Sequence, residues 1–212
     1  YRDGRLYTLS GGGYELPSFD SVLEMDQNKD GKIDQAENDA SEDMRGHFGF
    51  YDDDGDGYIT REEWKFLAEF MGKDTWGLQV VDLADPATAP EKGRWTHQKS
   101  LSNIPTPVLY GDVLYTVRGG GIFTSFDSET GEVIKRDRLT GALGDYYPSL
   151  VAADGKIFAA SNDGKVVVIE AQPEWQVIRV NDLGESIDAT PAIANGRLLV
   201  RTEGTLYAFA SE

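Results

Sequence analysis

Apolar and polar residues alternate in short runs along most of the chain, and turn residues bound each run. Alternation over about four to eight residues predicts half-buried strands, and glycine with aspartate or asparagine between two runs predicts hairpins. Four segments share this pattern: DGRLYTLSGGG from Asp3, GDVLYTVRGGGIFTSFD from Gly111, DGKIFAASNDGKVVVIE from Asp154 and NGRLLVRTEGTLYAFA from Asn195. The pattern therefore predicts a mainly β chain built from a repeated hairpin.

A proline-led strand precedes three of these hairpins and sets the length of the repeat. The strands are TPVLY, PSLVA and PAIAN, and their prolines, Pro107, Pro148 and Pro191, recur at nearly equal intervals. A period of about 40–45 residues with about four strands per unit is typical of β-propeller blades. We expect a β-propeller or part of one.

Residues 14–74 interrupt this repeat with helical periodicity. The segments PSFDSVLEM and REEWKFLAEFMG place Phe19, Val22 and Leu23, and then Trp64, Leu67 and Met71, at helical spacing. The hairpin of the second unit extends from Asp112 to Asp127, and that of the third unit has the same length. The corresponding hairpin of the first unit is much longer, because it extends from Gly4 to Asp82. The excess approximates the length of the helical segment, which predicts an insertion into a blade turn. The expected domains are propeller 1–13, inserted pair 14–74 and propeller 75–212.

Two segments of the insertion have the spacing of calcium loops. An EF-hand loop needs oxygen donors at positions 1, 3, 5, 9 and 12, a backbone carbonyl at 7 and glycine at 6. The first loop offers Asp26, Asn28, Asp30, the Lys32 carbonyl, Asp34 and Glu37, and the second offers Asp52, Asp54, Asp56, the Tyr58 carbonyl, Thr60 and Glu63. The glycines are Gly31 and Gly57, and the position-8 residues Ile33 and Ile59 should pair as a short β-bridge. The sequence predicts two bound calcium ions.

The connector between the loops indicates what kind of hand pair this is. Only the short segment 38–51 separates the loops, and we expect Gly46 and Gly49 to break it into two short turns. Short helices and a scarcity of methionine favour a structural or buffering pair, with a calmodulin-like sensor as the alternative.

Charge and composition exclude several classes of partner. The net charge is −17, of which −12 belongs to residues 14–74, so a nucleic-acid backbone is not expected as a partner. No apolar run approaches the roughly 20 residues that a membrane-spanning helix needs, so we expect no membrane span. There are no cysteines, which excludes disulfides and thiolate chemistry. The chain begins within a strand pattern, so an N-terminal propeller region or a protein partner is expected to complete the ring.

The segment SFDSETGEVIKR resembles the A-x-D-x-x-T-G-x-x-x-W signature of pyrroloquinoline-quinone-like β-propeller repeats. Asp127, Thr130 and Gly131 occupy matching positions, whereas Lys135 stands where the signature has tryptophan. Trp95 and Trp175 are the nearest aromatic residues in the neighbouring units. The resemblance implies a partial propeller of about three and a half four-stranded blades that carries an inserted EF-hand pair. Such families include scaffolds, such as outer-membrane assembly lipoproteins, beside the quinone enzymes, and because the tryptophan is missing we do not expect pyrroloquinoline quinone as a cofactor.

Catalytic motifs are absent from the sequence. His47 and His97 lie far apart without a partner at useful spacing, and there is no nucleophile elbow, P-loop or zinc-protease motif. The glycine runs after Ser10 and Arg118 occupy equivalent repeat positions and are interpreted as tight turns. One weaker constellation precedes the proline-led strands, where Asp145, Tyr146 and Asp188, with Ile104 at the equivalent position, would face a propeller channel and could bind a cation or polar ligand.

These observations favour a calcium-binding, non-enzymatic propeller that acts as an exported binding or scaffold module. Millimolar calcium outside the cell would keep even weak hands filled, so a bacterial extracellular or periplasmic location is expected. The alternatives are part of a quinone-dependent dehydrogenase, or a calcium-responsive adhesin or assembly subunit.

Overall fold

The chain folds into two compact units in a computed structural model, which describes residues 2–10, 16–71, 77–83, 94–102 and 104–210. One unit comprises residues 1–11 with 77–212, and the other comprises residues 12–76. Each unit has its own hydrophobic core.

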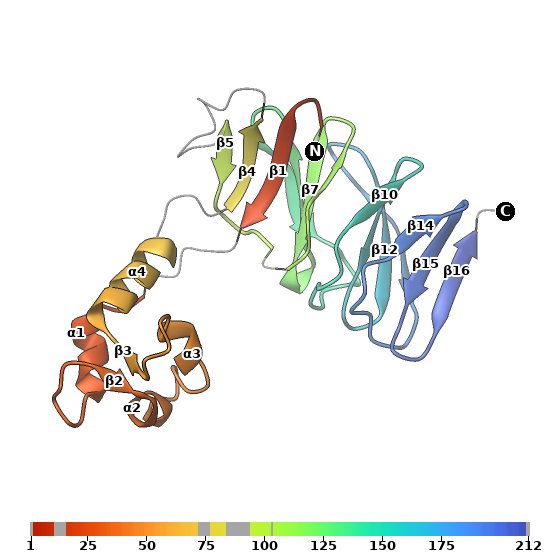
Figure 1. Ribbon diagram of the computed structural model, residues 1–212. Coiled ribbons are helices and arrows are strands. Elements are labelled where there is room, and N and C mark those ends of the chain that lie inside the picture. Colours follow the sequence, from red (N-terminus) through yellow and green to blue (C-terminus); the bar gives the residue numbers. More distant parts are fainter. Residues whose placement is uncertain (1, 11–15, 72–76, 84–93, 103, 211–212) are drawn as a thin grey trace. The chain divides into compact units, whose positions relative to one another are not determined.

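Four antiparallel sheets make up the larger unit (Figure 1). The first sheet has the order β1-β4-β5, from β1 (Arg5–Ser10), β4 (Gly77–Asp82) and β5 (Trp95–His97). The second runs β6-β7-β8-β9, from β6 (Val108–Tyr110), β7 (Val113–Arg118), β8 (Ile122–Asp127) and β9 (Val133–Arg138). The third runs β10-β11-β12-β13, from β10 (Val151–Ala153), β11 (Lys156–Ala160), β12 (Lys165–Glu170) and β13 (Val177–Asp182). The fourth runs β14-β15-β16, from β14 (Ala192–Ala194), β15 (Arg197–Arg201) and β16 (Leu206–Ala210).

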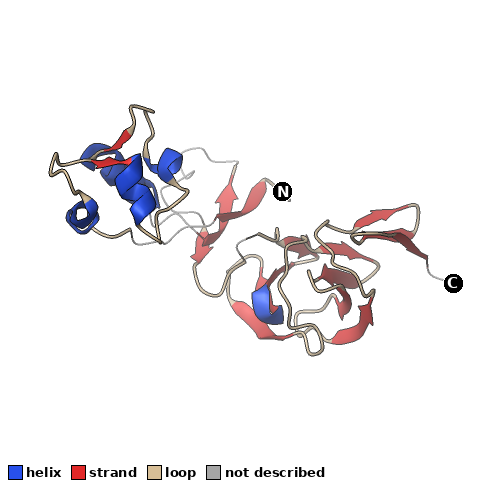
Figure 2. Cartoon of the chain, turned by 90° about the horizontal axis from the view of Figure 1, so that it is seen from below, coloured by secondary structure: helices blue, strands red, loops and turns tan. Residues whose placement is uncertain are grey.

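Among the described residues, two complete four-stranded sheets thus lie between two three-stranded ones. This confirms the predicted partial propeller of about three and a half blades. The proline-led strands of the prediction are β6, β10 and β14, and β10 contacts both β6 and β14. Figure 2 shows the strands of this unit from a second direction.

Both faces of the second and third blades are apolar because each of these blades packs between two others. In β7, Val113, Tyr115 and Val117 join the core shared with the third sheet, whereas Leu114, between them, packs toward the first sheet. Successive side chains of a strand point to opposite faces, so a continuous apolar run is what a strand buried on both sides requires.

Neighbouring blades also interlock at the signature turn. Gly131 has a φ of +74°, and a Cβ there would lie 2.5 Å from the Trp95 ring, so the indole rests directly on the glycine backbone. The Trp95 Nε1 donates to the Ser128 carbonyl at 3.1 Å. On the same blade, the replacement residue Lys135 contacts the third blade, because its Nζ lies 4.5 Å from the centre of the Trp175 ring and donates to the Trp175 carbonyl at 2.7 Å.

The insertion lies between two paired strands of the first blade. β1 pairs with β4 in continuous register from Arg5 opposite Asp82 to Ser10 opposite Gly77. Residues 11–76 therefore connect adjacent strands, as the excess length in the first repeat predicted. Such a connection leaves both strands in place, because the ends of the insertion are close together.

The smaller unit contains short helices and a two-stranded sheet. Its elements are α1 (Phe19–Val22), η1 (Leu23–Met25), β2 (Ile33–Asp34), α2 (Gln35–Ala40), α3 (Phe48–Tyr51), β3 (Tyr58–Ile59) and α4 (Arg61–Met71). Ile33 pairs with Ile59 and both are fully buried, which confirms the predicted bridge between the loops. Around them lie Phe19, Val22, Met44 and Trp64.

The connector between the loops corrects one detail of the sequence prediction. Gly46, with a φ of +82°, separates α2 from α3 as expected. Gly49 does not break the chain, since it lies inside α3. A glycine without positive φ can take a helical conformation, at a cost in backbone entropy.

Candidate metal centre

In the first loop, backbone N–H groups hold the donor carboxylates. The two oxygens of Asp26 accept from Lys29 at 2.7 Å and from Gly31 at 2.8 Å. Glu37 spans the loop, because Oε1 accepts from Gln27 at 2.7 Å while Oε2 accepts from Asp34 at 3.1 Å. Glu37 thus lies against both ends of the loop. The remaining side-chain acceptors, Asn28 and Asp30, are held by the backbone N–H groups of residues two positions further on.

Asp34 has two roles in this loop. Its Oδ1 accepts from the Glu37 N–H at 2.9 Å, and Glu37 in return accepts from the Asp34 N–H, which forms a capping box at the start of α2. A capping box fixes the first turn of a helix. The first turn of α2 therefore orients Glu37, the residue at position 12 of the loop.

The second loop repeats this arrangement almost bond for bond. Asp52 accepts from Gly55 at 2.8 Å and from Gly57 at 3.1 Å, and Gly57 has a φ of +89°. Glu63 accepts from Asp53 at 2.9 Å through Oε1, and from the Thr60 N–H and hydroxyl at 2.8 and 2.7 Å through Oε2. Asp54 and Asp56 accept from the N–H groups of Asp56 and Tyr58.

The carboxylates of the second loop also converge on one point. Among the described residues, one group of three side chains has its carboxylate oxygens all within 4.8 Å of one another: Asp52, Asp54 and Glu63. The first loop has an amide, Asn28, where the second has Asp54, so its carboxylates alone do not make such a group. Three converging carboxylates repel one another unless a cation lies between them.

Among the predicted calcium ligands, Glu63 is the one whose pKa is most clearly shifted by its surroundings. Partial burial alone would raise the pKa of its carboxyl group. Hydrogen bonds from the Thr60 hydroxyl and from the N–H groups of Thr60, Asp54 and Asp53 outweigh burial and lower the pKa below its ordinary value. The carboxylate is thereby kept ionised and available for a cation.

The residues present fit a calcium ion at each loop. All side-chain donors are oxygens, each loop has four carboxylates, and calcium takes six to eight such ligands. Asp26, Asn28, Asp30, Asp34 and Glu37 would provide the side-chain donors of one site, and Asp52, Asp54, Asp56, Thr60 and Glu63 those of the other. Lys32 and Tyr58 occupy the position of the carbonyl donor, and the Lys32 ammonium lies 4.5 Å from the centre of the Tyr58 ring.

The second predicted site lies in the propeller unit. Ile104, Asp145 and Tyr146 line one hollow of about 250 Å³ in the propeller unit. The Tyr146 hydroxyl does not face a ligand, because it donates to the Ala142 carbonyl at 2.8 Å and burial raises its pKa. Asp188 is not among the residues that line this hollow, and its carboxylate accepts from the Asn162 side chain. The Asn162 N–H donates to the Asp145 carbonyl at 2.7 Å, so Asn162 bridges the two aspartates.

The two histidines lie in different compact units. His97 packs edge-on against Phe126, with ring centroids 4.9 Å apart. Burial lowers the pKa of His97, and the nearby Arg136 adds to this effect, although a hydrogen bond with the Lys99 carbonyl opposes it. His47 precedes α3.

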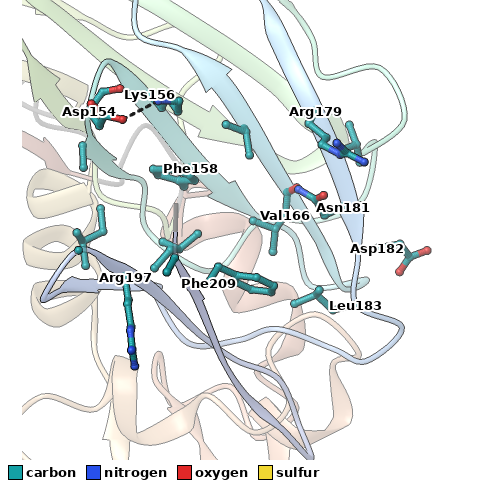
Figure 3. A pocket seen from close by; sticks show the side chains of 17 residues that line it. Asp154, Lys156, Phe158, Val166, Arg179, Asn181, Asp182, Leu183, Arg197 and Phe209 are labelled. Carbon is teal, nitrogen blue, oxygen red and sulfur yellow. Dashed lines mark hydrogen bonds and ion pairs between the residues drawn. The ribbon is translucent and has the colours of Figure 1, made fainter. Parts of the chain in front are cut away.

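A larger hollow, of about 960 Å³, lies between the third and fourth sheets (Figure 3). Its walls are largely apolar, with Phe158, Val166, Leu183 and Phe209 among them. Of the charged groups at its margin, Lys156 pairs with Asp154. Asp182 pairs with Lys165.

One functional candidate was not recognised in the sequence. Arg118 lines the smaller hollow, and its buried Nε has no hydrogen-bond partner among the described residues. The available signal was its position in the repeat, where the other units have serine or threonine.

Comparisons with known proteins agree with both parts of the fold. A family model described as the outer membrane protein assembly factor BamB matches residues 72–212. A model of the EF hand matches residues 23–37 and 46–68. Comparison with the curated proteins gives no match. Among the described residues, no helix is long and apolar enough to cross a membrane.

Several solved structures are similar to this chain at low sequence identity. BamB from Moraxella catarrhalis is 17% identical, with a TM-score of 0.49, over 62% of this chain and 39% of its own. The computationally designed protein Ika8 is 13% identical, with a TM-score of 0.50, over 63% of this chain and 40% of its own. The designed protein Ika4 is 14% identical, also with a TM-score of 0.50, over 63% of this chain and 78% of its own. The chain thus spans about two fifths of the length of the first two.

Proposed function

Because the chain belongs to the family of the outer membrane protein assembly factor BamB, we propose that it is a non-enzymatic binding or scaffold propeller whose inserted segment, residues 14–74, holds two structural calcium ions. The observation that carries this proposal is the matching architecture of the two loops. In each, the position-1 aspartate and the position-12 glutamate are fixed by backbone N–H groups of the loop itself.

A structural role for calcium is supported by the dimensions of the hand pair. α2 has six residues and α3 has four, so there is little helix to swing outward when calcium binds. A sensor needs a closed helix pair that opens to expose an apolar groove. We infer that calcium instead cross-links the loops and neutralises their charge.

A location outside the cytoplasm follows from the same proposal. Extracellular hands operate at affinities of about 10⁻⁴–10⁻³ M, where ambient calcium keeps them filled. A permanently bound ion adds its binding free energy to the stability of the folded segment. The proposed setting is periplasmic or extracellular, and the proposed partner is a protein, as the description of the matching family suggests.

The calcium part of the proposal is tested by calorimetric titration of the chelator-treated chain. We expect a stoichiometry of two for the wild type and of one for both Glu37→Gln and Glu63→Gln. The neutral amide in each variant keeps the shape of the side chain but removes one charged ligand. A matched control is Glu62→Gln, which changes an exposed neighbour outside the ligand set and should leave the stoichiometry at two. A stoichiometry of zero for the wild type would refute the proposal.

The non-enzymatic part is tested separately. The calcium-loaded chain, reconstituted with pyrroloquinoline quinone, should reduce no dye over a panel of alcohols and sugars. The sequence offers no general-base constellation for such a reaction. Sustained turnover would replace the scaffold proposal by the dehydrogenase alternative.

A further inference from the structure

Arg118 has a buried guanidinium nitrogen without a hydrogen-bond partner among the described residues. It ends β7, it is half-buried, and its Nε is shielded from solvent without a hydrogen-bond acceptor in the described part of the chain. Buried donors are almost always paired in folded proteins, so an unpaired one needs an explanation. A guanidinium carries five N–H donors, and leaving a buried one unsatisfied opposes folding.

In the other repeats, the residue at this position closes its own hairpin with a hydrogen bond. The equivalent residues are Ser10, Ser161 and Thr202, and each hydroxyl accepts a backbone N–H of its own hairpin. The donors are Gly77 at 3.2 Å, Lys165 at 3.2 Å and Thr205 at 3.1 Å. Arg118 cannot accept such a bond, since a guanidinium has no acceptor. The second blade therefore replaces a turn-closing hydroxyl with a cation whose Nε has no hydrogen-bond partner among the described residues.

The hollow beside Arg118 has the size of a single side chain. Its volume is about 250 Å³, below the roughly 300–1,000 Å³ of sites for larger ligands. Leu101, Ile104 and Pro105 line it from the segment before β6, and Tyr146 and Tyr147 line it from the segment before β10. Ile104 is 60% exposed and Tyr147 is 42% exposed, so apolar surface remains open to a ligand.

Two of the hydroxyl groups around the hollow are already bonded within the fold, whereas the Arg118 Nε has no acceptor among the described residues. The Ser102 hydroxyl donates to the Pro105 carbonyl at 3.1 Å, and the Tyr146 hydroxyl is bonded to Ala142. Asp145 also lines the hollow, and its Oδ1 is 2.7 Å from the place of a Cβ on Gly119. Asp145 and Arg118 nevertheless form no ion pair within 4.0 Å among the described residues.

We propose that the Arg118 hollow binds a carboxylate group carried on a small apolar body, either a free organic acid or an acidic side chain of a peptide. A carboxylate in the hollow could accept two parallel N–H bonds from the guanidinium. A doubly charged phosphate suits the site less well, because the Asp145 carboxylate would repel it more strongly. The proposal does not rest on the calcium sites, which belong to the other compact unit.

The test is a titration of the calcium-loaded, ¹⁵N-labelled chain, followed by amide chemical shifts. The free-acid probe is 3-methylbutanoate, with 3-methylbutanamide as its uncharged counterpart. The peptide probe is a blocked pentapeptide with one central glutamate, with the glutamine version as its counterpart. We expect saturable shifts around Gly119 and Asp145 with at least one charged probe and with neither uncharged one. The probe that binds more tightly identifies the source of the carboxylate.

Three variants separate binding from structure. Arg118→Ser restores the hydroxyl of the other repeats and should weaken binding about tenfold or more, with an unchanged or higher melting temperature. Arg118→Lys keeps the charge but loses the planar fork, so its affinity for the charged probe should lie between those of the wild type and Arg118→Ser. Arg179→Ser removes an exposed arginine elsewhere in the propeller and should bind as the wild type does.

Two kinds of result would overturn the proposal. One is the absence of saturable binding of either charged probe to the wild type, or its persistence in Arg118→Ser. The other is a clear fall in the melting temperature of Arg118→Ser, which would show that the arginine stabilises the fold.

Discussion

At the residue scale, the glycine at position 6 of each calcium loop carries a conformational demand that can be measured directly. Gly57 has a φ of +89°, and a Cβ there would meet nothing within 4 Å. Gly57→Ala should therefore act through backbone strain alone and lower the stability of the hand pair by about 1–2 kcal/mol. The measurement is thermal unfolding of the calcium-loaded chain, together with the calorimetric affinity of the second loop.

Gly49→Ala is the matched control for this change. Gly49 also has open space around it, but it lies in α3 without a positive φ. Alanine is favoured over glycine in a helix by about 0.5–1 kcal/mol, so this variant should be slightly more stable. If both alanines shifted the melting temperature in the same direction, the assignment of strain to Gly57 would be wrong.

Asp127 gives a prediction for the dependence of stability on pH. Its carboxylate accepts from the Thr130 N–H at 2.8 Å, the Glu129 N–H at 2.9 Å and the Thr130 hydroxyl. The Thr130 N–H lowers the pKa of Asp127 most, burial opposes this, and the Glu129 N–H and the Thr130 hydroxyl lower it further. A lowered folded pKa means that the charged form adds stability above the unfolded value of 3.8, and that this stability is lost as the pH falls through the folded pKa.

Asp127→Asn keeps an acceptor oxygen but removes the charge. At pH 7 it should cost about 0.5–1 kcal/mol, because a charge-assisted bond becomes a neutral one. The difference in melting temperature between wild type and variant should shrink from about pH 5 downward and vanish at the acid end. Both proteins contain the same calcium loops, so the effect of pH on these loops does not contribute to the difference in melting temperature. A difference that grew toward acid would contradict the sign of the shift.

At the scale of elements, local patterns were predictable from the sequence and long-range contacts were not. The bridge of Ile33 to Ile59 follows from the fixed spacing of an EF-hand loop, and the strands follow from alternation. The closing of the Gly131 turn by Trp95 depends on two blades meeting, which no local pattern encodes. Whether the Arg118 Nε has a hydrogen-bond partner depends on every side chain around it, so the sequence could mark the residue but could not show that no described residue bonds this nitrogen.

The contact of Trp95 with Gly131 should hold the first two blades together. Gly131→Ala adds a methyl group 2.5 Å from the indole ring, in addition to the strain of a φ of +74°. Gly155→Ala is the matched control, because Gly155 has a φ of +67° and open space around it. We expect Gly131→Ala to be about 1–3 kcal/mol less stable than Gly155→Ala, the usual cost of overpacking. Chemical denaturation measures the difference, and equal losses would show that Trp95 moves away freely.

At the scale of the whole molecule, the chain combines two kinds of stability. The propeller unit is held by apolar clusters between successive sheets. The hand pair has a small core and a segment charge of −12 over residues 14–74. Because its loops connect adjacent paired strands, the hand pair can change its stability without altering the register of β1 with β4. Calcium should therefore act on one unit only.

Hydrogen exchange of the intact chain, with and without a chelator, tests this separation. Removing calcium should restore repulsion among the four carboxylates of each loop and lower the stability of the hand pair. Amides of residues 18–71 should then exchange faster, with the largest change at Ile33 and Ile59, whose pairing links the loops. Amides of β7 and β11 should exchange at the same rate in both conditions, because their hydrogen bonds lie in the other compact unit. Equal acceleration in both units would mean that the chain unfolds as one cooperative body. Unchanged exchange in residues 18–71 would mean that calcium does not stabilise them.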